Sequence, residues 1–280
     1  MYICIISYSF LKMNKIQFIA EIGWNHMGNL KLAEKMIKAA SRSGADYAKF
    51  QTWRVKNLKK GPWDKDGRRQ IYEKAELKLE DYVLLKKICK KYKIKFLTSI
   101  FNPNDFELIE KLNLNEIKIP SPENRNLKLL NFCKKKYKKI FLSTGAASIK
   151  EIKKSYKIIK NKDVNLMHCV SAYPCEAKLV NLSRINELKE ITKKIGLSDH
   201  SSGIQSSVFA FGMGVTLIEK HFTVDNKLPG RDNKFAILPK DLKELIDKSK
   251  EFYEMYENKK NNFIKQELEI RKVYTGRWIK

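Results

Sequence analysis

The sequence lacks the features that mark a secreted scaffold or a membrane protein. Its 280 residues include only five cysteines, which are odd in number, scattered and never arranged as CxxC. This pattern excludes a disulfide scaffold and is typical of reduced thiols in a cytoplasm. No stretch approaches the roughly 18 consecutive apolar residues that a membrane-spanning helix needs. The sequence therefore predicts a cytoplasmic protein that does not cross a membrane.

The apolar start of the chain lacks the parts of a secretion signal. Residues 1–12 have neither a basic leading region nor a small-residue cleavage site. A second methionine, Met13, stands just before the first clear strand. We therefore expect residues 1–14 to be an N-terminal extension.

Acidic residues are scarce relative to basic ones. The chain has 31 Asp and Glu against 57 Lys and Arg, a formal net charge of +26. Such a charge raises the question of a nucleic-acid partner. The lysines, however, are spread from Lys12 to Lys280, and no stripe interleaves basic with aromatic residues, as single-strand binding would require. We expect no specific nucleic-acid partner, and a positive field that attracts anionic small molecules.

Short apolar segments alternate with segments of helical spacing along almost the whole chain. This alternation is the pattern of parallel βα units, and eight units in about 245 residues favour a closed barrel over an open sheet. The sequence predicts a (β/α)8 TIM barrel over residues 15–260, with residues 53–77 as a long loop and Ser148 capping a helix. The expected strands cover residues 16–22, 48–50, 95–99, 116–119, 139–143, 164–169, 194–198 and 215–220.

Polar and ionisable residues follow all eight expected strands, whereas the strands themselves are mainly apolar. In barrel enzymes the active site lies at the C-terminal ends of the strands. Scattered surface polarity would not select these ends, so the convergence predicts an enzyme. Two histidines, His200 and His221, end neighbouring strands, and paired imidazoles suit a divalent metal such as manganese or zinc. Glu21, at the end of the first strand, is a further possible ligand.

Two lysines and several serines occupy the same ends. Lys49 and Lys118 would be buried there, and a buried ammonium requires an anionic partner. Serine hydroxyls are able to donate to carboxylate or phosphate oxygens, so the set points to a phosphorylated carboxylic acid as substrate. The alternative is that each serine caps a helix. The serines concerned are Ser99, Ser121, Ser143 and Ser198.

At these residues the sequence resembles the sialic acid synthase family, which includes the legionaminic and pseudaminic acid synthases. Seven motifs occur in the family's order between about residues 16 and 260. They are Ile19-Ala-Glu-Ile-Gly-Trp-Asn-His-Met-Gly28, Lys49-Phe-Gln-Thr52, Lys118-Ile-Pro-Ser-Pro-Glu123, Leu142-Ser-Thr-Gly145, Met167-His-Cys-Val-Ser-Ala-Tyr-Pro174, Ile195-Gly-Leu-Ser-Asp-His200, and Glu219-Lys-His-Phe-Thr223 with Pro229-Gly-Arg-Asp232.

The resemblance implies a metal-dependent condensation of phosphoenolpyruvate with an N-acetylated hexose aldehyde, giving a nine-carbon 2-keto acid and phosphate. His200 and His221 would hold Mn²⁺ or Mg²⁺. The resemblance places Lys49 and Ser99 on the carboxylate of phosphoenolpyruvate, and Lys118, Ser121, Ser143 and Ser198 on its phosphate. It places Gln51, Tyr173 and Asp232 near the sugar and metal, with Ser171 as a further polar contact. Glu21 or Glu123 would handle the proton, and the choice between them stays open.

The resemblance covers the barrel and not the family's C-terminal antifreeze-like domain, which reaches across a dimer to supply an arginine to the sugar site. We expect residues 261–280 to be a C-terminal tail and the chain to form a homodimer. A second hypothesis is a catalytically weak barrel subunit that needs a separate partner domain.

Overall fold

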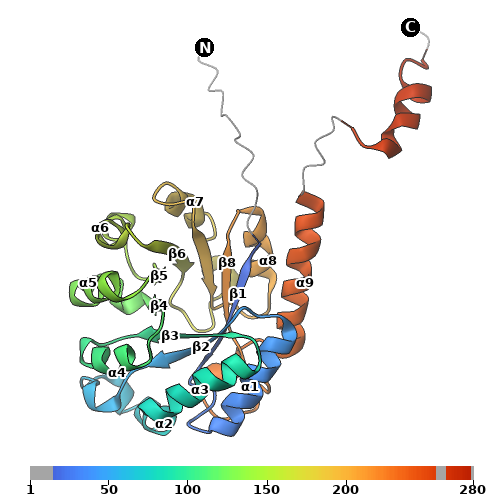
Figure 1. Cartoon of the computed structure of the whole chain (residues 1–280). Coiled ribbons are helices and arrows are strands. Elements are labelled where there is room, and N and C mark those ends of the chain that lie inside the picture. The colour runs from blue at the N-terminus through green and yellow to red at the C-terminus, as the bar shows by residue number, and fades with distance from the viewer. Residues whose placement is uncertain (1–14, 257–262, 279–280) are drawn as a thin grey trace.

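The computed structural model describes residues 15–256 and 263–278, and within them the strands close into a barrel in the order β1 to β8. All neighbouring strands are parallel, including β8 with β1. Figure 1 shows the strands enclosed by helices. The strands are β1 (Gln17–Gly23), β2 (Tyr47–Thr52), β3 (Lys95–Ile100), β4 (Glu116–Ile119), β5 (Lys139–Ser143), β6 (Asp163–Cys169), β7 (Ile195–Asp199) and β8 (Leu217–His221). The predicted (β/α)8 TIM barrel is confirmed.

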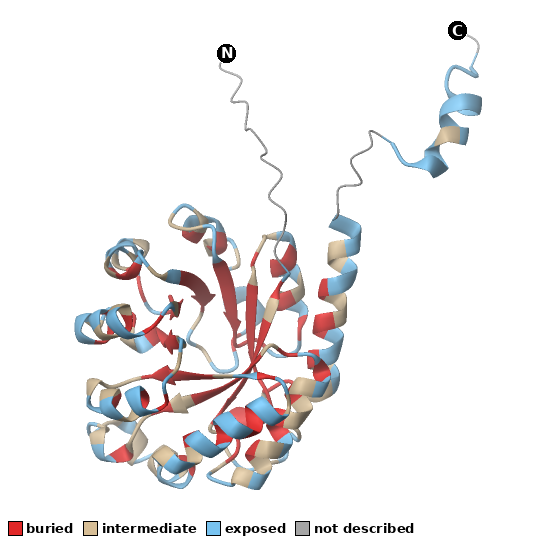
Figure 2. Ribbon diagram, viewed as in Figure 1, coloured by how far each residue is buried: buried red, intermediate tan, exposed pale blue. Residues whose placement is uncertain are grey.

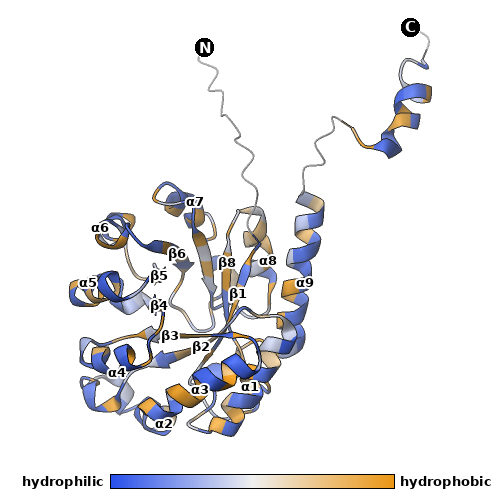
Figure 3. Cartoon of the chain, viewed as in Figure 1, coloured by the Kyte–Doolittle hydropathy of each residue, from blue (hydrophilic) through white to orange (hydrophobic). Residues whose placement is uncertain are grey.

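The helices cover the outside of the barrel. They are α1 (Leu30–Ser43), α2 (Arg68–Ala75), α3 (Leu79–Lys91), α4 (Phe106–Lys111), α5 (Leu127–Lys136), α6 (Ile149–Ile159), α7 (Arg184–Lys189), α8 (Gln205–Gly212) and α9 (Pro239–Tyr256). Each long helix turns an apolar stripe toward the strands and a charged face outward, as Figures 2 and 3 show. Helix α9 packs against α1 and α8 where the barrel closes.

Local sequence signals set several helix ends. Asn29 caps α1 by accepting from the backbone N–H of Leu32, and Gly44 ends the helix in the left-handed conformation. The predicted cap at Ser148 is confirmed, because its hydroxyl accepts from the Glu151 backbone while the Glu151 carboxylate accepts from the Ser148 backbone.

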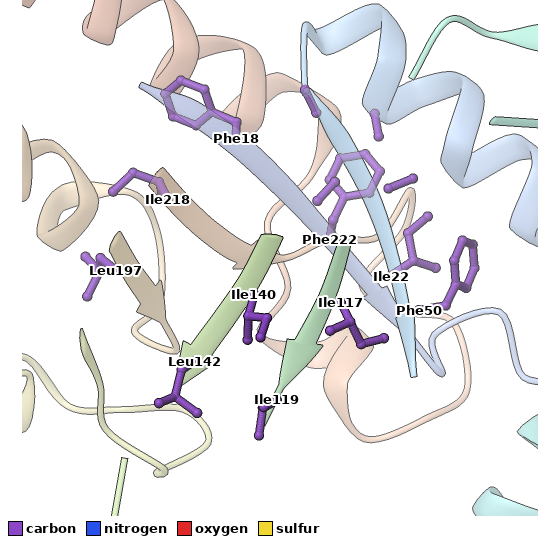
Figure 4. Close-up of a cluster of buried hydrophobic side chains, with 14 of the residues drawn as sticks. Phe18, Ile22, Phe50, Ile117, Ile119, Ile140, Leu142, Leu197, Ile218 and Phe222 are labelled. Atoms are coloured by element: carbon purple, nitrogen blue, oxygen red, sulfur yellow. The ribbon is translucent and has the colours of Figure 1, made fainter. Parts of the chain in front are cut away.

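Side chains alternate across each strand, and this alternation divides the interior into two apolar regions. Outward-facing residues such as Ile22, Ile117, Leu142 and Ile218 pack against the helices (Figure 4). Inward-facing residues fill the barrel itself as a separate cluster of Ile19, Tyr47, Leu97, Phe141, Met167 and Leu217. This inner cluster closes the barrel beneath the strand ends, so the site above it has a solid floor.

The predicted loop over residues 53–77 is wrong in part, because it contains helix α2 and two short 3-10 turns. The residues of α2, Arg-Arg-Gln-Ile-Tyr-Glu-Lys-Ala, are mostly good helix formers that follow Gly67. The glycine, proline and charged residues nearby are typical of a loop, so the sequence pattern did not indicate this short helix. Helix α4 is preceded by a 3-10 turn at Pro103–Asp105.

The predicted extension at residues 1–14 lies outside the described residues, as do positions 257–262 and 279–280. None of the helices within 15–256 and 263–278 is long and apolar enough to cross a membrane.

Candidate active site

A buried layer of polar side chains lies directly above the inner apolar cluster. Polar groups and one thiol lie on the same face of the strands, most of them two positions beyond a residue of this cluster. These side chains are all at most 4% exposed: Glu21, Lys49, Ser99, Ser143, Cys169, Ser198 and Glu219, with Lys118 from the short strand β4. The strand ends therefore converge on one site, as the sequence predicted.

Two lysines and two glutamates form the charged centre of this layer. Lys49 Nζ lies 2.7 Å from Glu21 Oε2 and 4.0 Å from Glu219 Oε2. Lys118 pairs with the other oxygen of Glu219, and the Ser198 hydroxyl donates to that same oxygen at 3.0 Å. Two cations thus face two anions in a water-poor space, which keeps the cluster neutral overall before any ligand binds.

Burial and charge act against each other on these groups. Burial raises the pKa of Glu21, and the nearby Glu219 raises it further, which outweighs the opposing charge of Lys49. Burial lowers the pKa of Lys118. Glu219 is also buried, but Lys118 and Lys49 hold its pKa at about 2. Glu219 is therefore the firmly ionised acid of the pair and Glu21 the one more ready to hold a proton.

Two of the predicted serines have no partner in the described structure. The hydroxyls of Ser99 and Ser143 are buried and make no hydrogen bond. Buried hydroxyls in native proteins are nearly always paired, so these two fit donors reserved for ligand oxygens. The helices that follow are capped by other residues, Asn102 and Ser148 among them, so the alternative of helix-capping serines fails at these positions.

The absence of a side chain at Gly145 lets two further serine hydroxyls lie close to its backbone. A Cβ placed on Gly145 would lie 2.6 Å from the Ser171 hydroxyl and 2.7 Å from that of Ser121. The backbone N–H of Gly145 donates to Ser121 at 3.1 Å. Ser121 in turn donates to the thiol of Cys169. Hydroxyls around an unobstructed backbone are a suitable surface for phosphate oxygens.

The two predicted metal histidines lie close together, with ring centroids 5.5 Å apart. Nδ1 of His200 lies 2.7 Å from the carbonyl oxygen of Val170, which leaves Nε2 of His200 for a ligand. Metal-binding histidines commonly donate their other nitrogen to such an acceptor. Nδ1 of His221 is buried without a hydrogen bond, and burial and the nearby His200 hold the pKa of His221 well below its usual value.

The residues present therefore fit a divalent ion held by two imidazoles, with other ligands from substrate or water. Among residues 15–256 and 263–278, no three His, Cys, Asp or Glu side chains enclose a metal position by themselves. Glu21 is bonded to Lys49 and Gln51, and the carboxylate beside His221 is Asp232, whose Oδ2 lies 3.5 Å from Nδ1. Burial raises the pKa of Asp232 to about 6.

The remaining predicted residues, with one exception, lie around the site at the C-terminal ends of the strands. Gln51 donates to Glu21 at 2.7 Å, and the Tyr173 ring packs 4.2 Å from that of His200. Ser171 is exposed beside Gly145. Glu123 is half-buried in the turn after β4, and its carboxylate accepts a hydrogen bond from Asn126 at 2.8 Å rather than from the charged centre.

Sequence reasoning missed Glu219 and Cys169 as parts of the site. Glu219 lies two residues before His221 on the same inward face of β8, so strand alternation would have placed it there. Burial raises the pKa of Cys169, but the His200 imidazole prevails and brings it to about 7. The thiol lies 3.9 Å from His200 Nδ1. The other two histidines bond to the backbone: His168 bonds the Val180 carbonyl and His26 accepts from the Gly28 N–H.

Comparisons with known proteins identify relatives of this chain. The NeuB family model matches residues 36–261. The N,N'-diacetyllegionaminic acid synthase of Campylobacter jejuni is 38% identical over 250 residues, which is 83% of this chain and 75% of that protein. The human N-acetylneuraminate-9-phosphate synthase is 32% identical, over 81% of this chain and 67% of its own length. The N-acetylneuraminic acid synthetase of Leptospira borgpetersenii superposes with a TM-score of 0.84 at 30% identity, covering 94% of this chain and 93% of its own.

Proposed function

The chain belongs to the NeuB family, and we propose that it is a synthase that condenses phosphoenolpyruvate with an N-acetylated hexose aldehyde and water. The products are a nine-carbon 2-keto sugar acid and phosphate. The observation that carries the proposal is the pairing of an anion-binding half, built from Lys49, Lys118 and unpaired serine hydroxyls, with a two-histidine half beside it.

In this proposal the anion-binding half holds phosphoenolpyruvate. Lys49 and Ser99 bind the carboxylate, while Lys118, Ser143 and Ser198 bind the phosphate with Ser121 and Gly145. A dianionic phosphate and a carboxylate bring up to three negative charges. The positive charge of the two lysines is offset by Glu21 and Glu219 before binding, so protonation of Glu21 helps to accommodate the substrate. The raised pKa of Glu21 favours that protonation.

The reaction forms a carbon–carbon bond from C3 of the enolpyruvate to the aldehyde carbon. Water adds at C2, and the bond between C2 and the phosphate oxygen then breaks. An acid of the site gives its proton to the former aldehyde oxygen and takes one back from the water, and the other proton of the water leaves with the phosphate, so atoms and charge balance. His200 and His221 would hold Mn²⁺ or Mg²⁺, which polarises the aldehyde and orients the water when bound.

Glu21 is the acid that we assign to the aldehyde oxygen. Its carboxyl group is buried, its pKa is raised, and it is bonded to Gln51, which faces the sugar in this proposal. Glu123 is left outside this role because its carboxylate is bonded to Asn126. Tyr173 and Asp232 border the sugar beside the metal position.

The test is phosphate release from phosphoenolpyruvate in the presence of Mn²⁺ and a panel of N-acetylated hexoses. We expect release that depends on both sugar and metal and that disappears in a chelator. Phosphate release that no sugar in the panel stimulates would reject the proposal. Activity that arises only after an added antifreeze-like domain would instead support the hypothesis of a barrel subunit with a separate partner. Light scattering of the same sample tests the expected homodimer.

A further inference from the structure

The turn that follows β5 is held by its neighbours from three sides. It covers residues 144–147, most of which are buried. On one side, the backbone N–H and the hydroxyl of Thr144 both donate to the backbone of β6, at 3.0 and 2.9 Å. On the second side, the guanidinium of Arg184 in α7 donates to the carbonyl oxygen of Ala147. On the third side, toward β4, hydrogen bonds come from the side chain of Asn124.

Asn124 bonds to the end of β5 at the point where the backbone ladder between β4 and β5 stops. The register of the two strands ends at the last residue of β4. Pro120 follows, and a proline has no N–H with which to extend the ladder. The side-chain amide of Asn124 instead donates to the carbonyl oxygens of Ser143, at 3.3 Å, and of Gly145, at 3.1 Å. Asn124 is only 2% exposed, so these two bonds are shielded from water.

The two carbonyls that Asn124 holds belong to residues that border the phosphate in the proposed reaction. The hydroxyl of Ser143 is buried and has no partner within the described residues. The backbone N–H of Gly145 donates to Ser121 at 3.1 Å. Rotation of either peptide group would displace these groups. Both hydrogens of the Asn124 amide are used by the two carbonyl oxygens, so neither is left for a ligand.

The backbone of the same turn is strained at Ala146. Its φ of 51° lies in the left-handed region, which is unfavourable for a residue with a side chain. Lys93 and Asn113 have similar φ angles, but they come just after the ends of helices, where this conformation is common. Ala146 comes after a strand. Strained residues persist only where their surroundings fix them, and they gather at ligand-binding positions, which fits a turn held in shape for a ligand.

Building on the proposed function, we propose that Asn124 is a positioning residue for phosphoenolpyruvate. Its amide fixes the peptide groups of Ser143 and Gly145, so the Ser143 hydroxyl and the backbone at Gly145 have the arrangement that the phosphate needs before it binds. A site that is arranged in advance loses less free energy to ordering and binds its ligand more tightly. In this role Asn124 contacts no substrate itself.

The experiment replaces Asn124 by leucine, which has a similar size but neither charge nor hydrogen-bond donor. Asn226→Leu is the matched control, because the Asn226 amide also donates to two backbone carbonyls, those of Asn233 and Ala236, in the connection after β8. We expect Asn124→Leu to raise both the KM and the Kd for phosphoenolpyruvate about tenfold. The KM for the sugar and the affinity for Mn²⁺ should change less than about twofold, since those groups lie on other strands. Asn226→Leu should leave the Kd for phosphoenolpyruvate at the parent value.

Asn124→Ala is a second variant in case leucine does not fit, and circular dichroism shows which variants are folded. A role in stability alone would lower the Tm of a folded variant and leave its Kd for phosphoenolpyruvate unchanged, and this result would overturn the proposal. An equal rise of that Kd in the control, or the failure of both Asn124 variants to fold, would overturn it as well.

Calorimetric titration of phosphoenolpyruvate measures the Kd without any sugar. If no sugar stimulates phosphate release, the proposed function fails, and the titration still decides the role of Asn124. Binding by the parent that weakens in the Asn124 variants and not in the control supports that role. A parent chain that binds no phosphoenolpyruvate would refute it.

Discussion

The ammonium group of Lys220 lies 3.1 Å from the Asp199 carboxylate, on the outer side of the barrel and directly behind the two site histidines. The two residues face each other in the register of β7 and β8, and each immediately precedes a histidine, His200 or His221. Asp199 also accepts hydrogen bonds from Ser201, and from Ser206 and Ser207. The ion pair therefore holds together the ends of β7 and β8, the two strands that position the histidines.

Asp199→Asn should weaken both the fold and the histidine pair. Removing one partner of a buried ion pair costs about 3–5 kcal/mol, which urea unfolding would measure. We also expect Mn²⁺ affinity to fall about tenfold, as when a metal ligand loses its support, with bound Mn²⁺ followed by electron paramagnetic resonance. Lys220→Arg keeps the charge and should retain most of the affinity. Unchanged Mn²⁺ affinity in a folded Asp199→Asn variant would contradict this role.

Acid stability should also depend on Asp199. Burial raises the pKa of this carboxyl group, but Lys220 and the serine hydroxyls prevail and hold it below the ordinary 3.8. The stabilisation is therefore complete above about pH 4 and is lost as the pH falls through the folded-state pKa. We expect the free energy of unfolding of Asp199→Asn to fall less steeply than that of the parent below pH 4. If the free energies of unfolding of the parent and of Asp199→Asn fall in parallel below pH 4, Asp199 does not have this role in acid stability.

His221→Ala should abolish Mn²⁺ binding and turnover while the barrel stays folded. The matched control is His168→Asn, because His168 bonds the Val180 carbonyl and takes no part in the site. The control should retain Mn²⁺ affinity at some cost in thermal stability. Normal Mn²⁺ binding by a folded His221→Ala variant, measured by equilibrium dialysis, would remove His221 from the metal site.

Glu219→Gln should shift the alkaline limit of phosphoenolpyruvate binding to lower pH. Burial lowers the pKa of Lys118, and the charge of Glu219 opposes that effect. Without Glu219, Lys118 loses its proton at a lower pH and with it the attraction for phosphate. Calorimetric titration of phosphoenolpyruvate between pH 7 and about 10 measures the limit. If the alkaline limit of phosphoenolpyruvate binding is the same in Glu219→Gln and in the parent, the protonation of Lys118 does not govern that binding.

Gly145→Ala should weaken phosphoenolpyruvate binding, because the new methyl would meet the hydroxyls of Ser121 and Ser171 well inside contact distance. We expect the KM for phosphoenolpyruvate to rise at least tenfold, equivalent to about 1.4 kcal/mol. Gly212→Ala at the end of α8 is the control, since nothing lies within 4 Å of its added methyl. Equal KM values in the two variants would exclude the phosphate position proposed at Gly145.

The order of strands and helices was predictable because the spacing of apolar residues and the polar residues at strand ends are local properties of the sequence. Strands β4 and β5 have the expected bounds, and His200 and His221 meet at adjacent strand ends. The motif resemblance then gave the family and assigned roles to most site residues. Local sequence patterns could not predict which side chains pair with one another across the barrel.

The pairings of Lys118 with Glu219 and of Lys220 with Asp199 depend on register and on which face each residue takes. Glu219 is separated from Lys118 by about a hundred positions, so no local window relates them. The contacts among the rings of Trp24, Trp53 and Tyr72 were missed for a similar reason. Trp24, Trp53 and Tyr72 come from different connections, and the helix that carries Tyr72 was expected to be a loop.

The inner layer of polar groups draws at least one side chain from each of the eight strands, and closure of β8 on β1 brings them together. Loss of any one βα unit would remove a charge, a hydroxyl, a thiol or a histidine and open the ring at the same time. Each half of the ring holds only part of this layer: β1–β4 carry Glu21, Lys49 and Lys118, whereas β5–β8 carry Glu219 and His221. Opening of the ring at any pair of strands therefore separates groups that the proposed site needs together, so local unfolding and loss of the site coincide.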